Sequence, residues 1–123
     1  MARILVVDDD EFARFLIKSV LEQDGHEIQF AKDGIEGAAA AHSPEIDLIV
    51  MDMNMPRMTG FEATRQIKSS AHPSKAPVLA LTASDKTGDY EEAYQAGCDA
   101  YISKPIDSEV LLERVRGLLG RKS

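Results

Sequence analysis

Four short apolar runs in this chain have the composition of β-strands, and each one leads into a residue with a polar, reactive side chain. The runs and the residues that follow them are Ile4–Val7 with Asp8, Leu48–Met51 with Asp52, Val78–Leu81 with Thr82, and Ala100–Ile102 with Ser103 and Lys104. Runs that are apolar throughout suit parallel strands buried on both faces of a sheet. The carboxyl ends of parallel strands meet at one edge of the sheet, where open α/β folds bind their ligands. We therefore expect carboxylates, a hydroxyl and an ammonium group to share one pocket.

The segments between these runs have the spacing and the end signals of helices. In the first, Phe12, Phe15, Leu16 and Val20 recur at helical spacing and Gly25 follows as a stop signal. The predicted helices cover residues 11–24, 35–41, 61–69, 90–96 and a last segment with Leu111 to Leu119, and a further short strand covers residues 27–31. Strands that alternate with helices predict a parallel sheet with right-handed crossovers and helices on both faces.

Size and charge narrow the function classes. The 123 residues suit one domain, residues 1–123, with a substantial core. A formal net charge of −7 argues against binding nucleic acid or an anionic membrane directly, because surfaces that track phosphates are basic. No apolar stretch approaches the ~20 residues of a membrane span, and no signal-peptide core follows Met1, so we expect a cytoplasmic protein. Cys98 is the single cysteine, which excludes an intrachain disulfide and suits a small packing residue.

The acidic residues predicted at the sheet edge need a cation. Carboxylates that share a pocket repel one another and are driven toward the protonated form unless positive charge lies among them. Mg²⁺ prefers oxygen ligands and is usually held by one or two carboxylates together with a phosphate, so Asp8, Asp9 and Asp52 are candidate ligands. An acidic helix N-terminus is the alternative interpretation of this run. That alternative explains Asp10 and leaves Asp8 and Asp9 without a purpose.

Asp52 is a candidate nucleophile. Aspartate is depleted in strands and costly to bury unpaired, although a solvated carboxylate at the start of a loop remains an alternative. Aspartate attacks phosphorus to form an aspartyl phosphate, and phosphoryl transfer mainly needs positioning and neutralisation of the phosphoryl oxygens. Mg²⁺ would neutralise one oxygen, the Lys104 ammonium a second, and the Thr82 hydroxyl would donate to a third. Considered alone, Lys104 would be an ordinary surface lysine and Thr82 an ordinary strand-forming residue.

The motifs resemble the receiver domain of two-component response regulators over essentially the whole chain. They are Ile4–Asp9, Met51–Pro56 with Gly60 following, Leu81–Ala83, and Tyr101–Pro105. The resemblance implies a flavodoxin-like, doubly wound α/β fold with a five-stranded parallel sheet of order 2-1-3-4-5 and five helices. It implies phosphorelay signal transduction, and the Lys104–Pro105 peptide bond is often cis in such domains.

The resemblance also implies a role for each site residue. Asp52 is expected to be the phosphoacceptor, with Asp8 and Asp9 as the acid pair that holds Mg²⁺. Asn54 is expected to offer its backbone carbonyl to the metal, and Lys104 to bind the phosphoryl group.

Thr82 is implied as the switch hydroxyl and Tyr101 as the switch aromatic, whose rotamer follows the movement of Thr82. We expect the output on the fourth helix, the fifth strand and the fifth helix, around Tyr90, Tyr101 and Glu109. The implied partners are a sensor histidine kinase or histidine phosphotransfer protein, a downstream effector, and a second copy of this chain. The motifs match receivers of hybrid kinases and stand-alone regulators alike.

Three other functions fit less well. A phosphohydrolase of the dehalogenase type also uses an aspartate nucleophile at a strand end, but places a second aspartate where Asn54 stands. A flavin carrier would need a phosphate loop after the first strand, and the acidic run there would repel the flavin phosphate. A nucleotide-binding enzyme would need a Gly-x-x-x-x-Gly-Lys loop, which is missing from the sequence. We expect the chain to catalyse only its own phosphorylation and dephosphorylation.

Overall fold

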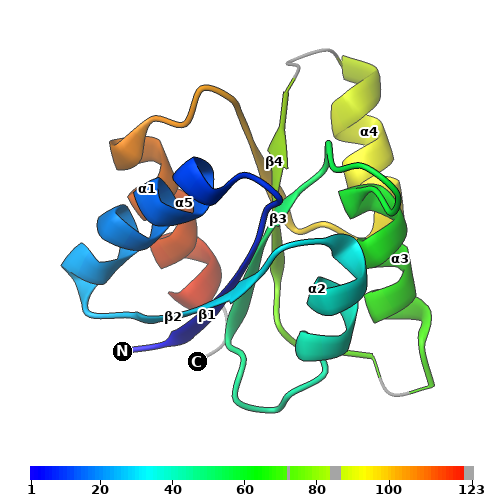
Figure 1. The fold of residues 1–123 in the computed structure, drawn as a ribbon, viewed down its shortest axis with the longest axis horizontal. Coiled ribbons are helices and arrows are strands. Elements are labelled where there is room, and N and C mark those ends of the chain that lie inside the picture. The colour runs from blue at the N-terminus through cyan, green and yellow to red at the C-terminus, as the bar shows by residue number, and fades with distance from the viewer. Residues whose placement is uncertain (72, 84–86, 121–123) are drawn as a thin grey trace.

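A parallel sheet with strand order β2-β1-β3-β4-β5 lies at the centre of the protein (Figure 1). The computed structural model describes residues 1–71, 73–83 and 87–120. The strands are β1 (Arg3–Val7), β2 (Glu27–Ala31), β3 (Leu48–Asp52), β4 (Val78–Thr82) and β5 (Ala100–Ser103). All four neighbouring pairs run parallel. The expected flavodoxin-like order is therefore confirmed.

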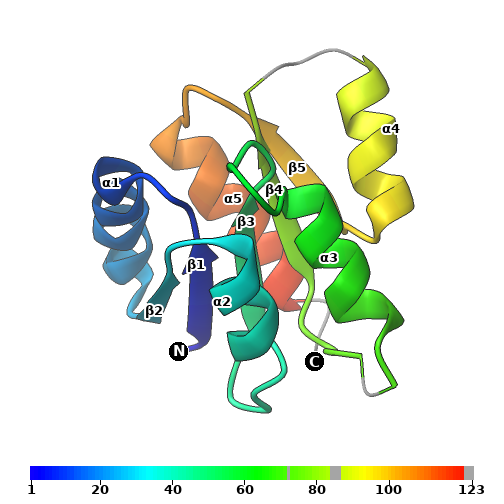
Figure 2. The ribbon, with the colours of Figure 1, turned by 45° about the vertical axis from the view of Figure 1, so that its right-hand side comes forward.

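Helices cover both faces of this sheet. They are α1 (Glu11–Leu21), α2 (Gly34–Ala40), α3 (Gly60–Ser69), α4 (Thr87–Ala96) and α5 (Ser108–Gly120), with a 3-10 turn, η1 (Glu22–Asp24), after α1. Figures 1 and 2 show α1 and α5 on one face and α2, α3 and α4 on the other. The predicted first helix corresponds to α1 followed by η1. It ends before Gly25, which adopts a left-handed conformation with φ 79°. No helix in the described ranges has the length and hydropathy needed to cross a membrane.

The apolar strands divide the core into two layers. In β1, Ile4 and Val6 belong to the core layer that also contains buried residues of α1 and α5, whereas Leu5 and Val7 belong to the layer that contains buried residues of α2, α3 and α4. Both faces of β1, β3 and β4 are covered, and their apolar residues are almost completely buried. This double burial is the reason that the strands are apolar throughout rather than alternating.

The apolar pattern of α1 predicted the helix correctly but does not mark a single buried face. Phe12 and Phe15 are 73% and 65% exposed, whereas Val20 is buried together with Ile17 and Leu21. A helix turns about 100° per residue, so Phe12 and Phe15 lie on the opposite side from the residues that reach the sheet. The chain therefore presents an aromatic surface on α1 that packing within the domain does not explain.

The start of α3 is fitted closely against the end of β3. Thr59 and Glu62 form a reciprocal capping box at the helix N-terminus. Gly60 follows the cap, and its N–H donates to the Met53 carbonyl at 3.2 Å. A Cβ atom at Gly60 would collide with the Asp52 carbonyl oxygen and with the Met53 Cα. The glycine is needed here for close approach of two backbones.

We predict that Gly60→Ala lowers the free energy of unfolding by about 2–3 kcal/mol, as overpacking of a rigid contact does. The matched control is Gly117→Ala in α5, where a Cβ meets no atom within 4 Å. That substitution should raise the free energy of unfolding by about 0.5–1 kcal/mol, since alanine is the better helix former. Urea unfolding of both variants provides the measurement, and equal effects of the two would contradict the proposed backbone collision.

Candidate functional site

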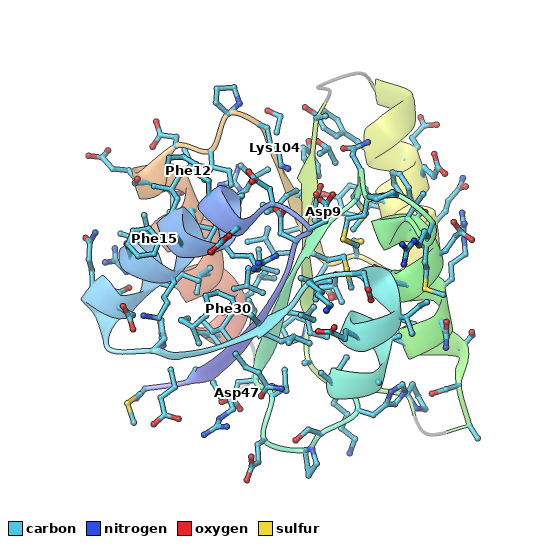
Figure 3. The ribbon with its side chains drawn as sticks, viewed as in Figure 1. Asp9, Phe12, Phe15, Phe30, Asp47 and Lys104 are labelled. Atoms are coloured by element: carbon cyan, nitrogen blue, oxygen red, sulfur yellow. The ribbon has the colours of Figure 1, made fainter. Side chains whose placement is uncertain are left out.

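The four strand ends identified in the sequence gather at one edge of the sheet. Asp8 follows β1, Asp52 closes β3, Thr82 closes β4 and Lys104 follows β5. Because β3 lies between β1 and β4, Asp52 is at the centre of this group. Figure 3 shows Asp9 and Lys104 at the same end of the sheet, with Asp47 at the opposite end. The predicted meeting of these strand ends at one edge, with the carboxylates beside the ammonium, is confirmed.

The Lys104 ammonium holds two buried carboxylates. Its Nζ lies 3.3 Å from Asp52 Oδ1 and 3.7 Å from Asp8 Oδ2. Asp8 is completely buried and Asp52 is 2% exposed, while the Lys104 side chain keeps partial contact with solvent. Buried charges require partners, and here one cation serves two anions.

Main-chain donors orient both carboxylates. The Asp10 N–H donates to Asp8 Oδ1 at 2.9 Å, and the Asn54 N–H donates to Asp52 Oδ1 at 3.0 Å. In contrast, Asp8 Oδ2 has no hydrogen-bond partner, and it is the sole buried side-chain atom of this kind within the described ranges. A buried carboxylate oxygen that has a distant ion pair but no hydrogen bond is well suited to a further cation.

Asp10 has the separate role that the sequence suggested for it. Its carboxylate accepts from the N–H groups of Phe12 and Ala13, both at 3.3 Å, and caps α1. The helix cap therefore accounts for Asp10 alone. Asp9, which is exposed, and the buried Asp8 stay available to the pocket.

The pKa of Asp8 is raised above its usual range. Burial is the largest cause, and the charges of Asp52 and Asp9 add to it. The Asp10 N–H and the Lys104 ammonium act in the opposite direction and only partly compensate. The pocket is thus short of positive charge.

The acidic residues have the arrangement that a metal ion requires. Asp8, Asp9 and Asp52 each place a carboxylate oxygen so that the three atoms lie within 4.8 Å of one another. Oxygen ligands with negative charge suit a hard divalent cation such as Mg²⁺. The three residues can therefore hold a metal, and a divalent cation would offset the charge that Lys104 leaves unbalanced.

Two further contacts at this edge were not found from the sequence. The Asn54 side-chain Oδ1 accepts from the Ala83 N–H at 2.8 Å, whereas the sequence pointed only to the Asn54 backbone carbonyl. Arg14 Nη1 donates to the Asp8 carbonyl at 2.7 Å. Both are long-range or side-chain-to-backbone contacts, and no spacing in the sequence signals them.

Thr82 joins β4 to the residue that follows β5, and Tyr101 of β5 packs against a neighbouring helix. The Thr82 side chain is buried, and its carbonyl accepts from the Lys104 N–H at 2.7 Å, which ties β4 to β5. The Tyr101 ring stacks on Tyr90 with a centroid distance of 3.8 Å and meets Tyr94 edge-on at 5.6 Å. Tyr101 therefore packs against α4. The Lys104–Pro105 bond is cis, as expected.

Comparison with known proteins gives a consistent answer. A family model for the response regulator receiver domain matches residues 4–116. The chain is 37% identical over 119 residues to the protein PilH of Pseudomonas aeruginosa, an alignment that covers 97% of this chain and 98% of PilH. It is 39% identical over 121 residues to the DNA-binding dual master transcriptional regulator RpaA of Synechocystis, covering 98% of this chain and 50% of RpaA. The chain thus spans nearly all of PilH and about half the length of RpaA.

Solved structures show the same similarity. The chemotaxis protein CheY4 of Vibrio cholerae superposes with a TM-score of 0.87 at 32% identity, covering 96% of this chain and 98% of CheY4. The receiver domain of the sensor histidine kinase PA1611 from Pseudomonas aeruginosa gives a TM-score of 0.87 at 31% identity, covering 97% and 98% of the two chains. That second structure has a magnesium ion coordinated in its active-site cleft.

The raised pKa of Asp8 predicts how stability depends on pH. The folded protein keeps the Asp8 proton at pH values where the unfolded chain has already released it, so ionised Asp8 lowers the free energy of unfolding as the pH rises above the ordinary pKa of 3.8. Asp8→Asn keeps an acceptor for the Asp10 N–H and removes the charge. We predict that it raises the free energy of unfolding at pH 7 in excess chelator by about 0.5–2 kcal/mol, the range of single stabilising substitutions.

The gain should shrink when urea unfolding is repeated near pH 3, because this pH lies below the ordinary pKa of 3.8 and Asp8 is then protonated in both states. Asp9→Asn serves as the control at an exposed position of the same cluster and should stabilise less. If Asp8→Asn instead lowers the free energy of unfolding at pH 7, the buried charge of Asp8 does not destabilise the folded protein.

Proposed function

Because this chain belongs to the response regulator receiver family, we propose that Asp52 accepts a phosphoryl group from a phosphohistidine on a partner protein. The chain is a receiver domain, and its function is phosphorelay signal transduction. The observation that carries the assignment to Asp52 is its position. Its carboxylate closes the central strand β3, lies 3.3 Å from the Lys104 ammonium and belongs to the acidic cluster with Asp8 and Asp9.

In the proposed step a carboxylate oxygen of Asp52 attacks the phosphorus atom. A new P–O bond forms, the P–N bond to the donor imidazole breaks, and its electron pair returns to the ring nitrogen. Little else is required of the protein beyond positioning and charge neutralisation. The Lys104 ammonium would move from shared contact with two carboxylates to a phosphoryl oxygen, and the Thr82 hydroxyl would donate to another.

We propose Mg²⁺ as the metal that the acidic cluster holds. The carboxylates of Asp8, Asp9 and Asp52 would be its protein ligands, together with the Asn54 backbone carbonyl. The magnesium ion in the PA1611 receiver structure supports this choice. When bound, the ion supplies the positive charge that offsets the negative phosphoryl oxygens.

We also propose that the chain does not act on a separate substrate, and catalyses only its own phosphorylation and dephosphorylation. A phosphohydrolase of the dehalogenase type needs a carboxylic acid two residues after the nucleophile. Asn54 stands there instead, and its amide neither gives nor takes a proton at neutral pH.

The net charge of −7 argues against direct binding to nucleic acid. We assign the protein to the cytoplasm, together with its phosphodonor.

The exposed side of α1 is the surface that we assign to the phosphodonor protein. A donor must bring its phosphohistidine to the Asp52 pocket and therefore covers residues around the pocket mouth. The helix begins at Glu11, directly after the acidic run, and Phe12 and Phe15 lie within its first two turns. Both phenylalanines are largely exposed, and exposed aromatic groups are typical anchors of protein interfaces. We propose that a histidine kinase or phosphotransfer protein packs against them.

The output surface is assigned to α4, β5 and α5. Thr82 and Lys104 stand at the ends of β4 and β5 and would both gain a phosphoryl partner, while Tyr101 contacts Tyr90 and Tyr94 of α4. A phosphoryl group can shift a conformational equilibrium only through such differential contacts. We propose that Tyr101 and Thr82 form the switch, and that an effector protein or a second copy of this chain binds this surface.

The phosphoacceptor assignment predicts that Mg²⁺ and acetyl phosphate add one phosphate to the protein, detected by intact-mass spectrometry. Asp52→Asn should abolish the addition, and excess chelator should do the same. Asp47→Asn, which changes a carboxylate at the opposite end of the sheet, should be labelled like the wild type (Figure 3). Label that persists in Asp52→Asn would assign the phosphate to another residue.

The docking assignment predicts a difference between protein and small-molecule donors. With a phosphorylated kinase or phosphotransfer protein that acts on the wild type, Phe15→Ala should transfer roughly tenfold more slowly, as loss of an interface anchor does. Its phosphorylation by acetyl phosphate should stay within about twofold, because the pocket is untouched. The control is Ile35→Ala on α2, which removes an equally exposed apolar side chain on the other face of the sheet. Equal slowing with both donors would exclude a docking role for Phe15.

A further inference from the structure

The Asn54 side chain makes a contact that the proposed phosphorylation does not use. Its Oδ1 accepts from the Ala83 N–H at 2.8 Å, while its own backbone N–H donates to Asp52 Oδ1 at 3.0 Å. An N–H group can only donate, so the amide oxygen, and not the amide nitrogen, must face Ala83. Asn54 thus joins the carboxylate of the phosphoacceptor to the end of β4, 29 residues further along the chain.

The position of the Ala83 N–H follows from the parallel pairing of β3 and β4. The Met53 N–H donates to the Leu81 carbonyl at 2.9 Å, so the next donor in the ladder is the Ala83 N–H and its regular acceptor would be the Met53 carbonyl. That carbonyl accepts from the Gly60 N–H instead. The Ala83 N–H is left at the end of the ladder, and the Asn54 side chain supplies the acceptor that the sheet does not.

A phosphoryl group on Asp52 would be added beside this donor. Asp52 pairs in register with Leu81, and Ala83 lies two residues further on, just past Thr82. Asn54 contacts Asp52 through its backbone N–H and Ala83 through its side-chain oxygen, so a single residue links the carboxylate to this N–H. A charged phosphoryl oxygen is a stronger acceptor than a neutral amide oxygen. The two acceptors would compete for one hydrogen.

We propose that Asn54 holds the Ala83 N–H in the unphosphorylated protein and gives it up to a phosphoryl oxygen when Asp52 is modified. This rests on the proposed function and adds a positioning residue to it. The Asn54–Ala83 bond stabilises only the unphosphorylated state, so its loss opposes phosphorylation. Asn54 is exposed, and one hydrogen bond at such a position changes an equilibrium by about two- to tenfold.

The hydrogen bond itself is tested by the Ala83 amide resonance in ¹⁵N-labelled protein. Without a phosphate mimic, Asn54→Ala should shift this resonance away from its wild-type position. Asn54→Asp retains an oxygen for the N–H and should keep the hydrogen-bonded proton shift. Thr59→Ala is the matched control, because it removes a side chain of the same loop that bonds Glu62 and not Ala83.

The exchange of partners is tested by adding Mg²⁺ and beryllofluoride, which imitates a phosphoryl group. The Ala83 resonances of the wild type and Asn54→Ala should then coincide, because the mimic has replaced Asn54 as the acceptor in both. With saturating Mg²⁺, Asn54→Ala should bind beryllofluoride about two- to tenfold more tightly than the wild type.

Two results would overturn the inference. An Ala83 difference between wild type and Asn54→Ala that persists with the mimic bound would show that Asn54 never releases the N–H. Unchanged or weaker beryllofluoride binding by Asn54→Ala would show that the contact does not oppose phosphorylation. A wild type that fails to bind the mimic at all would instead remove the proposed function, and with it this role of Asn54.

Discussion

The chemistry of this protein depends on an unequal charge balance at one edge of the sheet, where the Lys104 ammonium lies beside a cluster of three carboxylates. Lys104 lies within 3.3–3.7 Å of Asp52 and Asp8, and Asp9 completes the cluster. Burial is the main cause of the raised pKa of Asp8, and the excess of negative charge adds to it. The arrangement persists because the fold is held by its core, and the unfavourable charge is relieved when a cation binds. The pocket is therefore suited to hold a metal ion.

The sheet order places Asp52 next to several strand ends. With β3 in the centre, the Asp52 carboxylate lies beside residues that follow β1 and β5, and β3 pairs directly with β4. The main-chain bonds from Lys104 to Thr82 and from Met53 to Leu81 fix these strand ends to one another. The contact between Asn54 and Ala83 is different, because a side chain makes it where the regular ladder has ended. Contacts of that kind are the ones that a new ligand can exchange without disturbing the core.

Much of this arrangement could be predicted from the sequence, and the exceptions have physical reasons. The strands were recognisable because burial on both faces makes them apolar throughout, and their parallel direction brought Asp52, Thr82 and Lys104 together. The exposure of Phe12 and Phe15 was not predictable, since helical spacing shows that residues share a face but not which face meets the sheet. The side-chain contact of Asn54 depends on how two loops distant in sequence approach each other. The roles of Asp52 as phosphoacceptor and of Tyr101 as switch aromatic stay predictions.

The central claim is that a phosphoryl group at Asp52 acts through Thr82 and Lys104 on the surface of α4, β5 and α5. It is tested most directly by mapping backbone amide chemical shifts over the whole chain with Mg²⁺, before and after adding beryllofluoride. The account predicts large changes at the carboxyl ends of β3, β4 and β5 that continue through Tyr101 into α4 and α5. Changes confined to α1 and α2, with β4 and β5 unaffected, would contradict it.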